Sequence, residues 1–221
     1  MNNFFVTGTD TDVGKTRISE ALIELLREQG HTVAGMKPIA SGCDMTADGL
    51  RNDDAVRLIE QANADLPYDL INPYAFEPAI APHIAARQAG VSIDLKLIKS
   101  SYQQIQQKTD VVVVEGAGGW LVPINETETM ADLAKTLNLS IVLVVGIRLG
   151  CINHALLTIE SIKQSGLSIV GWVANNIEIN TQSAEIIDTL TQRLAVPLLA
   201  EIPYLSEHQK AKEYIDLEFM K

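Results

Sequence analysis

Two kinds of apolar run alternate along this chain. Six runs are short and rich in β-branched residues, as in buried strands. They read NFFVTG, HTVAGMKPIA, DVVVVEGAGG, LSIVLVVGIRLG, LSIVGWVANN and VPLLAEIPYL. Between them, apolar residues recur at helical spacing. The first such helix begins near Lys15 and ends before Gly30, which can occupy the left-handed position after a helix. Strands that alternate with helices predict an α/β fold, with a doubly wound, mostly parallel sheet and helices on both faces.

The remaining helices follow from the same periodicity. Their apolar faces are carried by Leu133, Ala134 and Leu137, by Leu156, Ile159 and Ile162, and by Ile186, Ile187, Leu190 and Leu194. The stretches NDDAVRLIEQANA and DLKLIKSSYQQIQQKTD also predict helices. Residues 65–82 contain four prolines and predict a long ordered loop. Such loops in compact domains are usually functional or disordered. The apolar residues of this one favour a functional loop.

Length and charge narrow the class of protein. The 221 residues fit a single α/β domain over 1–221. A net charge of −11 argues against nucleic acid or an anionic membrane as a partner. Neither a signal peptide nor an apolar run of about 20 residues is visible, so we expect no membrane segment. Two distant cysteines suit a reducing, cytoplasmic location.

Polar clusters follow each predicted strand. They comprise residues 8–16, Lys37 with Ser41, residues 115–119, residues 150–153, Asn175 with Asn176, and residues 203–205. In an open α/β sheet, ligands bind beyond the carboxyl ends of the strands. Six clusters on one edge therefore predict a single binding site.

The stretch VTGTDTDVGKT, residues 6–16, resembles a phosphate-binding loop between a strand and a helix. Five residues separate Gly8 from Gly14, where the usual pattern has four. Amides at a helix start favour phosphate, and Gly14 lets the backbone approach it. Lys15 would reach the β- and γ-phosphates, and the Thr16 hydroxyl would bind Mg²⁺. The other interpretation is an ordinary strand–turn–helix junction with a surface lysine.

Three acidic or basic side chains have two readings each. Glu115 ends an apolar strand and could share Mg²⁺ with Thr16, or it could simply cap the strand. Asp54 could be a third ligand, or an acid favoured at a helix start. Lys37 could bridge a transferring phosphoryl group and the attacking anion, or be a solvated surface lysine.

Residues 150–153 precede a predicted helix and offer a second anion site through their amides; the plainer reading is a turn with an Asn cap. Other chemistries find no support. The four histidines lack metal-ligand spacing, no Gly-x-Ser-x-Gly elbow is present, and GAGG lacks the dinucleotide-binding spacing.

Taken together, seven stretches resemble the dethiobiotin synthetase family. They read VTGTDTDVGKT, KPIASG, GLRNDDA, VVEGAGGW, LGCINHALLT, GWVANN and EIPYL, in that family's order and spacing, from residue 6 to about residue 205. The resemblance implies a P-loop NTPase fold and an ATP-dependent ligase of biotin biosynthesis. It implies Mg²⁺ as cofactor, ATP as co-substrate, small-molecule substrates and a homodimer.

The reaction that the resemblance implies closes a cyclic urea on 7,8-diaminononanoate. One amine takes up CO2 to form a carbamate, whose oxygen attacks the γ-phosphate of ATP. The second amine then attacks the carbonyl of the carbamic–phosphoric anhydride, and phosphate leaves. Such chemistry depends on positioning and charge neutralisation, and no protein nucleophile is required.

The resemblance also assigns residues. The catalytic residues are expected to be Lys37, Lys15 and Thr11. The expected ATP-binding residues are Asp12, Val13, Gly14, Lys15, Thr16, Arg17, Asp54, Glu115, Gly116, Ala117, Gly118, Asn175, Asn176, Pro203, Tyr204 and Leu205. The substrate-binding residues are expected to be Ser41, Gly150, Cys151, Ile152 and Asn153, the last four lent by the partner subunit to hold the substrate carboxylate. The expected Mg²⁺ ligands are Thr16, Asp54 and Glu115. Asp12 stands where some relatives carry glutamate.

The nearest rival is a P-loop ATPase that positions cellular cargo. Such proteins carry an extra lysine early in the loop, where this chain has Asp10. A regulatory GTPase would need an Asn-Lys-x-Asp motif, which VANNIE does not supply. A glutamine-dependent amidoligase would need a second domain, for which 221 residues leave no room.

Overall fold

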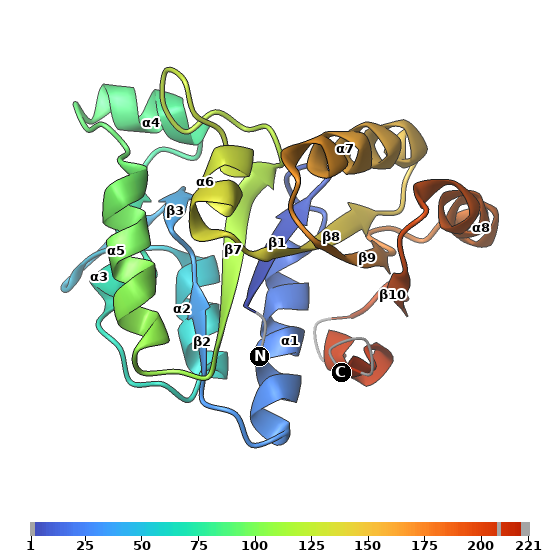
Figure 1. Ribbon diagram of the computed structural model, residues 1–221, viewed down its shortest axis with the longest axis horizontal. Coiled ribbons are helices and arrows are strands. Elements are labelled where there is room, and N and C mark those ends of the chain that lie inside the picture. Colours follow the sequence, from blue (N-terminus) through green and yellow to red (C-terminus); the bar gives the residue numbers. More distant parts are fainter. Residues whose placement is uncertain (1–2, 207–208, 218–221) are drawn as a thin grey trace.

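A six-stranded parallel sheet lies at the centre of the protein, whose computed structural model describes residues 3–206 and 209–217 (Figure 1). In spatial order its strands are β10 (Leu198–Ile202), β9 (Ile169–Asn175), β8 (Ser140–Gly146), β1 (Phe4–Gly8), β7 (Val111–Gly119) and β2 (Val33–Met36). Every neighbouring pair is parallel. The predicted doubly wound α/β fold is therefore confirmed.

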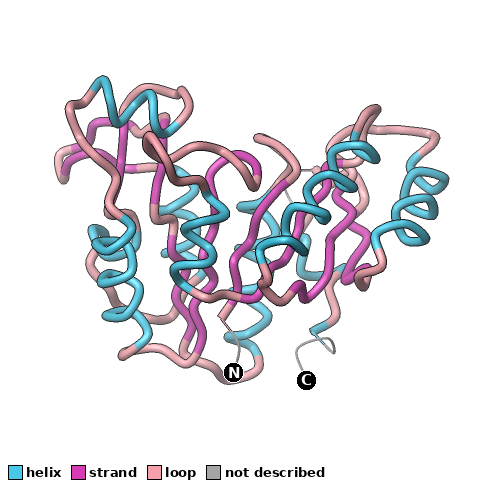
Figure 2. The backbone as a smooth tube through the Cα atoms, turned by 45° about the horizontal axis from the view of Figure 1, so that its top comes forward, coloured by secondary structure: helices cyan, strands magenta, loops and turns pink. Residues whose placement is uncertain are grey.

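Helices cover both faces of this sheet (Figures 1 and 2). One face packs against α1 (Lys15–Glu28), α2 (Asp53–Gln61) and the short 3₁₀ helix η1 (Ala211–Tyr214). The other packs against α5 (Leu95–Gln106), α6 (Met130–Leu137), α7 (Cys151–Ser165) and α8 (Ser183–Leu194). Alternate strand residues supply the two cores: Phe4 faces α1, and Phe5 faces the opposite layer. Strands buried on both faces explain the continuous apolar runs.

The direction of winding reverses at β1. From β1 the chain passes through α1 to β2 on one side, whereas α6 carries it from β7 to β8 on the other. Such a reversal leaves a crevice beyond the carboxyl ends of the strands, where α/β proteins bind ligands. Residues 9–14 lie at this crevice, directly between β1 and α1.

The second predicted strand is wrong in extent, because it divides at Lys37 and Pro38. Residues beyond β2 form β3 (Ile39–Ser41), which pairs with β6 (Tyr74–Phe76) in a separate two-stranded sheet. Pro38 has no N–H to donate, and the Lys37 N–H bonds to the Ile71 carbonyl outside the main sheet. The chain therefore turns away from the central sheet at this point.

The predicted long loop over residues 65–82 is also wrong. This segment contains α3 (Tyr68–Ile71) and β6, and then enters α4 (Pro82–Gln88). Pro67 precedes the first turn of α3 and Pro82 begins α4, positions at which proline is well tolerated. Between β3 and α2 lies a small hairpin of β4 (Asp44–Thr46) and β5 (Gly49–Arg51).

Two further observations complete the fold. Strand β7 continues through Glu115 to Gly119, so Glu115 lies inside the strand, opposite Val6, and does not end it. Among the described residues, no helix is long and apolar enough to cross a membrane.

Candidate functional site

A cavity of about 1370 Å³ opens beyond the carboxyl ends of the central strands. It brings together most of the predicted site residues: Thr11, Asp12, Gly14, Lys15, Thr16, Arg17, Lys37, Ser41, Asp54, Glu115, Ala117, Gly118, Asn175, Asn176, Tyr204 and Leu205. These residues come from five of the six polar clusters and from the start of α2. The volume exceeds that of a typical single-ligand pocket, as a site for a nucleotide and a second substrate requires.

The phosphate loop adopts a constrained backbone. Asp12 and Gly14 both have positive φ, at 58° and 91°. A Cβ on residue 14 would lie 2.2 Å from Asn175 Nδ2, so only glycine fits there. Asn175 Nδ2 also donates a hydrogen bond of 2.8 Å to the Val13 carbonyl. The end of β9 therefore braces the loop, and the loop amides are fixed before any ligand binds.

Lys15 is buried at the start of α1, and its ammonium donates to the Asp10 carbonyl at 2.9 Å. Burial, and secondly the positive charge of Lys37, lower the pKa of Lys15 to about 8. Glu115, Asp54 and Asp12 offset this effect only in part. A phosphate anion beside the ammonium would oppose it further, because a nearby negative charge favours the charged form. The surface-lysine interpretation of this residue is wrong.

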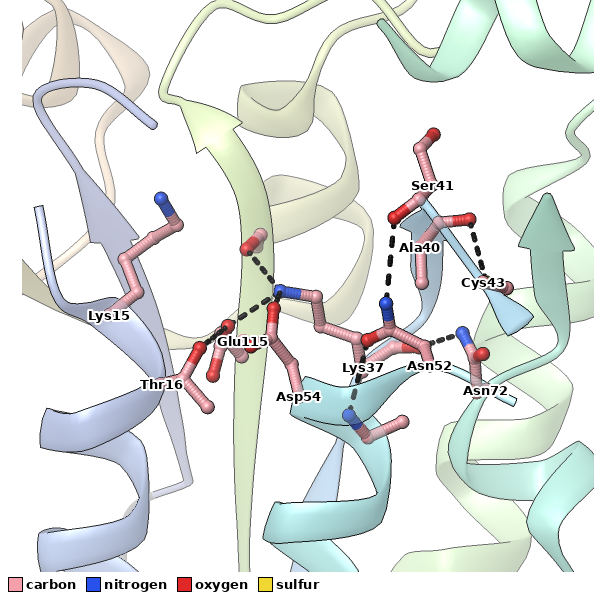
Figure 3. Close-up of polar contacts among 12 residues, drawn as sticks. Lys15, Thr16, Lys37, Ala40, Ser41, Cys43, Asn52, Asp54, Asn72 and Glu115 are labelled. Atoms are coloured by element: carbon pink, nitrogen blue, oxygen red, sulfur yellow. Dashed lines mark hydrogen bonds and ion pairs between the residues drawn. The ribbon is translucent and has the colours of Figure 1, made fainter. Parts of the chain in front are cut away.

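Lys37 is also buried, and it lies between two carboxylates (Figure 3). Its ammonium is 2.5 Å from Glu115 Oε1 and 2.8 Å from Asp54 Oδ2. Burial alone would lower the pKa of Lys37, but the charges of Glu115 and Asp54 raise it. Lys37 is therefore protonated, and its reading as a solvated lysine is wrong. Asp54 lies in the first turn of α2, where the helix dipole favours an acid, and it also contacts the Lys37 ammonium.

The predicted cation ligands meet at the same point. The Thr16 hydroxyl donates to Glu115 Oε1 at 2.9 Å, and Glu115 Oε2 is buried without a partner among the described residues. Burial raises the pKa of Asp54, but the neighbouring charge of Lys37 holds it below its usual range, so this carboxylate is available as an anion. No group of three or more His, Cys, Asp or Glu side chains in residues 3–206 and 209–217 could hold a metal alone. Two carboxylates and a hydroxyl suit Mg²⁺ that completes its shell with water and phosphate oxygens.

Ser41 is placed where it can meet a substrate. It lies at the end of β3, lines the cavity, and its buried Oγ has no partner in the described part of the chain. Asn52 fixes the surrounding backbone: its Oδ1 accepts from the Ala55 N–H at the start of α2, and its Nδ2 donates to the Ser41 carbonyl at 3.5 Å. A buried hydroxyl without a partner indicates a position at which a ligand supplies one.

One wall of the cavity was missed by sequence reasoning. It is made by residues 79–82, at the end of the proline-rich segment, together with Ala40, Gly42 and Val122. Asn52, Arg57, Ile177 and Ser206 also line the cavity and were not predicted. Residues 79–82 belong to the segment that is predicted to be functional. They do not follow a predicted strand, so no sequence pattern singles them out.

On the opposite side, Asn176 ties β9 to β10. Its Nδ2 donates to the Ile202 carbonyl at 2.8 Å, and its buried Oδ1 has no partner in the described residues. Tyr204, Leu205 and Ser206 continue this wall. The chain then returns to α1, where Lys210 and Lys212 pair with Glu24.

Seven predicted residues do not line this cavity. Val13 is buried in the core, and Gly116 and Pro203 lie behind the lining residues. Gly150, Cys151, Ile152 and Asn153 are also absent from the lining. The Asn-cap reading is wrong, because Gly150 is the N-cap residue before α7 and Asn153 lies inside the first turn of that helix. Leu149, next to this start, is 96% exposed.

Comparisons with known proteins identify the family of this chain and relate its fold to solved structures. A model of the AAA domain family matches residues 2–212. In solved structures, the MinC:MinD cell division complex of Aquifex aeolicus is similar in fold, with a TM-score of 0.61 at 15% identity, covering 94% of this chain and 83% of that one. At that identity the likeness concerns the fold alone.

Curated relatives are much more similar. An ATP-dependent dethiobiotin synthetase from Pseudomonas paraeruginosa is 48% identical over 94% of this chain and 92% of its own length. One from Vibrio campbellii is 46% identical over 99% of this chain and 97% of its own length. With relatives this similar along nearly its whole length, this chain belongs to the dethiobiotin synthetase family, the ATP-dependent ligases of biotin biosynthesis.

Proposed function

We propose that the large cavity is where this chain joins 7,8-diaminononanoate, CO2 and ATP to give dethiobiotin, ADP and phosphate. One observation carries the proposal: the phosphate loop and the buried ammonium of Lys37 open into the same cavity. A nucleotide held by the loop would present its γ-phosphate to a second reactant held beside Lys37. The cavity is large enough for both molecules.

In this proposal the protein positions reactants and neutralises charge. One substrate amine takes up CO2 to form a carbamate, and a carbamate oxygen attacks the γ-phosphorus as ADP leaves. Lys15 neutralises the β- and γ-phosphates, and Lys37 the negative charge between carbamate and phosphate. The second amine then attacks the anhydride carbonyl, and phosphate leaves. Thr11 and Ser41 are proposed to orient the diamine through their hydroxyl groups.

The oxygen ligands that this chain offers suit a magnesium ion. Thr16, Asp54 and Glu115 would hold it, with the buried Glu115 Oε2 as a free acceptor. When bound, Mg²⁺ would neutralise phosphate oxygens during phosphoryl transfer. Asn175 and Asn176, with residues 203–205, are proposed to surround the adenine, because amide side chains both donate and accept hydrogen bonds.

The working assembly is proposed to be a homodimer in which residues 150–153 of one subunit hold the substrate carboxylate of the other. Exposed apolar side chains support this arrangement. Leu121 and Leu157, which line one surface pocket, are 59% and 64% exposed, and Leu149, just before α7, is 96% exposed. Exposed apolar side chains that lie together mark protein interfaces. Two buried cysteines without a disulfide, Cys43 and Cys151, accord with a cytoplasmic location.

The test is the identity of the product. The purified chain should be incubated with 7,8-diaminononanoate, ¹³C-bicarbonate and Mg-ATP, and the products identified by mass spectrometry. We expect labelled dethiobiotin and one ADP for each molecule formed, with neither product when the diamine is omitted. ATP hydrolysis that proceeds without the diamine, and without label in any organic product, would contradict the proposal.

A further inference from the structure

Asp10 makes three hydrogen-bonded contacts, two through its side chain and one through its backbone carbonyl. Its Oδ2 accepts from Arg148 Nη2 at 2.5 Å, and its Oδ1 accepts from the Thr11 N–H at 2.8 Å. Its backbone carbonyl accepts from the Lys15 ammonium at 2.9 Å. One residue of the phosphate loop is thus bound to Lys15 of the same loop, to the amide of the next residue, and to the guanidinium of a residue that follows β8.

Arg148 is anchored independently of the loop. It follows β8, and the Ile147 N–H beside it donates to the Asn175 carbonyl at 2.8 Å. Its own carbonyl accepts from the Cys151 N–H, at the first residue of α7. The Arg148 backbone is therefore fixed between β9 and α7. The guanidinium of such a residue can hold a flexible partner in place.

The loop needs such a constraint. Beyond Asp10 it passes through exposed Thr11 and then Asp12, whose φ is 58° although it is not glycine. Left-handed backbone at a residue with a side chain persists only where the surroundings enforce it. Asn175 braces the second half of the loop through Val13. Near the start, the Thr9 N–H bonds to the Val144 carbonyl, and Asp10 supplies the link between that anchor and Thr11.

We infer that Asp10 and Arg148 form a positioning pair that holds the Thr11 part of the phosphate loop in its reactive conformation. The inference rests on the proposed catalytic role of this cavity. Asp10 and Arg148 are not among the described residues that line the large cavity, so they act through Thr11 and Lys15. An error of about 1 Å in the placement of reacting groups can cost a hundredfold in rate.

The pair is too exposed to be explained by stability. The side chains of Asp10 and Arg148 are 47% and 39% exposed, and ion pairs at such positions contribute little to folding. A matched pair exists on α6, where Asp132 and Lys135 are 38% and 46% exposed. Asp132 also caps α6 through Thr129, so the comparison removes only the basic partner of each pair. Loss of either basic side chain should change the melting temperature little, whereas only the loss of Arg148 should change the reaction.

The experiment compares Asp10→Asn, Arg148→Met, Arg148→Lys, the double variant Asp10→Asn/Arg148→Met and the control Lys135→Met. We expect each of the first two to lower kcat about tenfold, with the ATP dissociation constant changed less than about threefold. The double variant should be no slower than the slower single variant. Arg148→Lys should regain at least a third of the wild-type kcat, and Lys135→Met should equal wild type.

A second readout is independent of turnover. In ¹⁵N amide spectra, Arg148→Met should shift or broaden the resonances of residues 10–14, and Lys135→Met should not. Unchanged loop resonances would overturn the inference whether or not the chain makes dethiobiotin. Wild-type kcat in both single variants, or losses that multiply in the double variant, would also overturn it. Labelled dethiobiotin from the wild-type chain tests the proposed function separately.

Discussion

The pKa values of the two buried lysines in this site are shifted in opposite directions. Lys15 contacts a carbonyl and no carboxylate, and burial lowers its pKa to about 8. Lys37 contacts two carboxylates, and its pKa is raised. Nearby carboxylates therefore only partly offset the cost of burying Lys15, whereas Lys37 is paired directly with two of them. This contrast separates a nucleotide-binding role from a role in the reaction, and each role makes a prediction.

Lys15→Met is expected to stabilise the nucleotide-free protein at pH 7. An unfolded lysine titrates near 10.5 and folded Lys15 near 8, so the unfolded chain binds more protons between these values. Below pH 8 the charged lysine destabilises the fold by up to about 3 kcal/mol, and this cost disappears as pH rises towards 10.5. Denaturant unfolding of the variant and wild type from pH 7 to 10 should show the gain shrinking. Exposed Lys99→Met is the control, and a less stable Lys15→Met protein at pH 7 would contradict the account.

Lys37→Gln is expected to bind ATP almost normally by calorimetry and to form almost no dethiobiotin. An interaction made mainly in the transition state shows in kcat, and losing one such charge typically costs about 10²–10³. Glu115 would also lose its buried partner, which typically costs about 3–5 kcal/mol, so the assay belongs well below the variant's melting temperature. If the variant keeps more than about a third of the wild-type kcat, Lys37 has no role in the reaction.

Among the elements, the C-terminal segment packs on α1 and follows the residues that form one wall of the cavity. Ala211, Ile215 and Leu217 are buried against α1, and Lys210 and Lys212 pair with Glu24 on that helix. The pKa of Glu24 is lowered by these pairs against the effect of burial. The segment follows Tyr204, Leu205 and Ser206, which line the cavity. We therefore expect the docking of η1 on α1 to hold this wall beside the phosphate loop.

Ile215→Asp is expected to loosen this docking and raise the KM for ATP several-fold, with kcat less affected. A carboxylate buried in this apolar contact would lose its hydration without gaining a partner. Ile215→Val, which typically costs about 0.5–1.5 kcal/mol, is the matched control and should keep the wild-type KM. An Ile215→Asp protein that is destabilised but has an unchanged KM for ATP would show that the segment does not hold the wall.

The elements also show what the sequence alone could and could not predict. The six main strands and the helices around α1 and α7 follow from apolar periodicity, because local burial patterns determine them. The division at Lys37 depends on a hydrogen bond to Ile71, 34 positions along the chain, and no local pattern reports it. The helix and strand in residues 65–82 were likewise hidden by prolines that begin elements as well as break them.

The candidate site could also be predicted only in part, because local patterns report the ends of strands but not the tertiary contacts between elements. Residues at strand ends, such as Lys15 and Asn176, could be selected because parallel strands present their ends at one edge. The apolar wall of residues 79–82 reaches the cavity through the packing of β6 on β3, which is a tertiary event. The ion pair between Asp10 and Arg148 joins residues 138 positions apart, and charge patterning could not reveal it.

At the scale of the whole molecule, the proposed homodimer predicts complementation between two inactive variants. Lys37→Gln disables a subunit's own site, and Asn153→Asp puts a repelling carboxylate in the anchor that it lends to its partner. Random mixing makes half of the dimers hybrid, each with one site intact, so activity should recover to about a quarter of wild type. Each variant refolded alone is the control. Hybrid dimers that are detected by native mass spectrometry yet remain inactive would contradict shared sites.

In the proposed reaction, a carbamate oxygen attacks the γ-phosphate of ATP while both reactants are bound in one cavity. The most direct measurement follows ¹⁸O from labelled bicarbonate, equilibrated to labelled CO2, into both products in a single turnover with 7,8-diaminononanoate and Mg-ATP. The account predicts one ¹⁸O in the released phosphate and one in the urea carbonyl of dethiobiotin, because the attacking oxygen stays with phosphorus. Phosphate without ¹⁸O would show that water, and not the carbamate, attacks the γ-phosphorus, and the proposed coupling between the phosphate loop and Lys37 would be wrong.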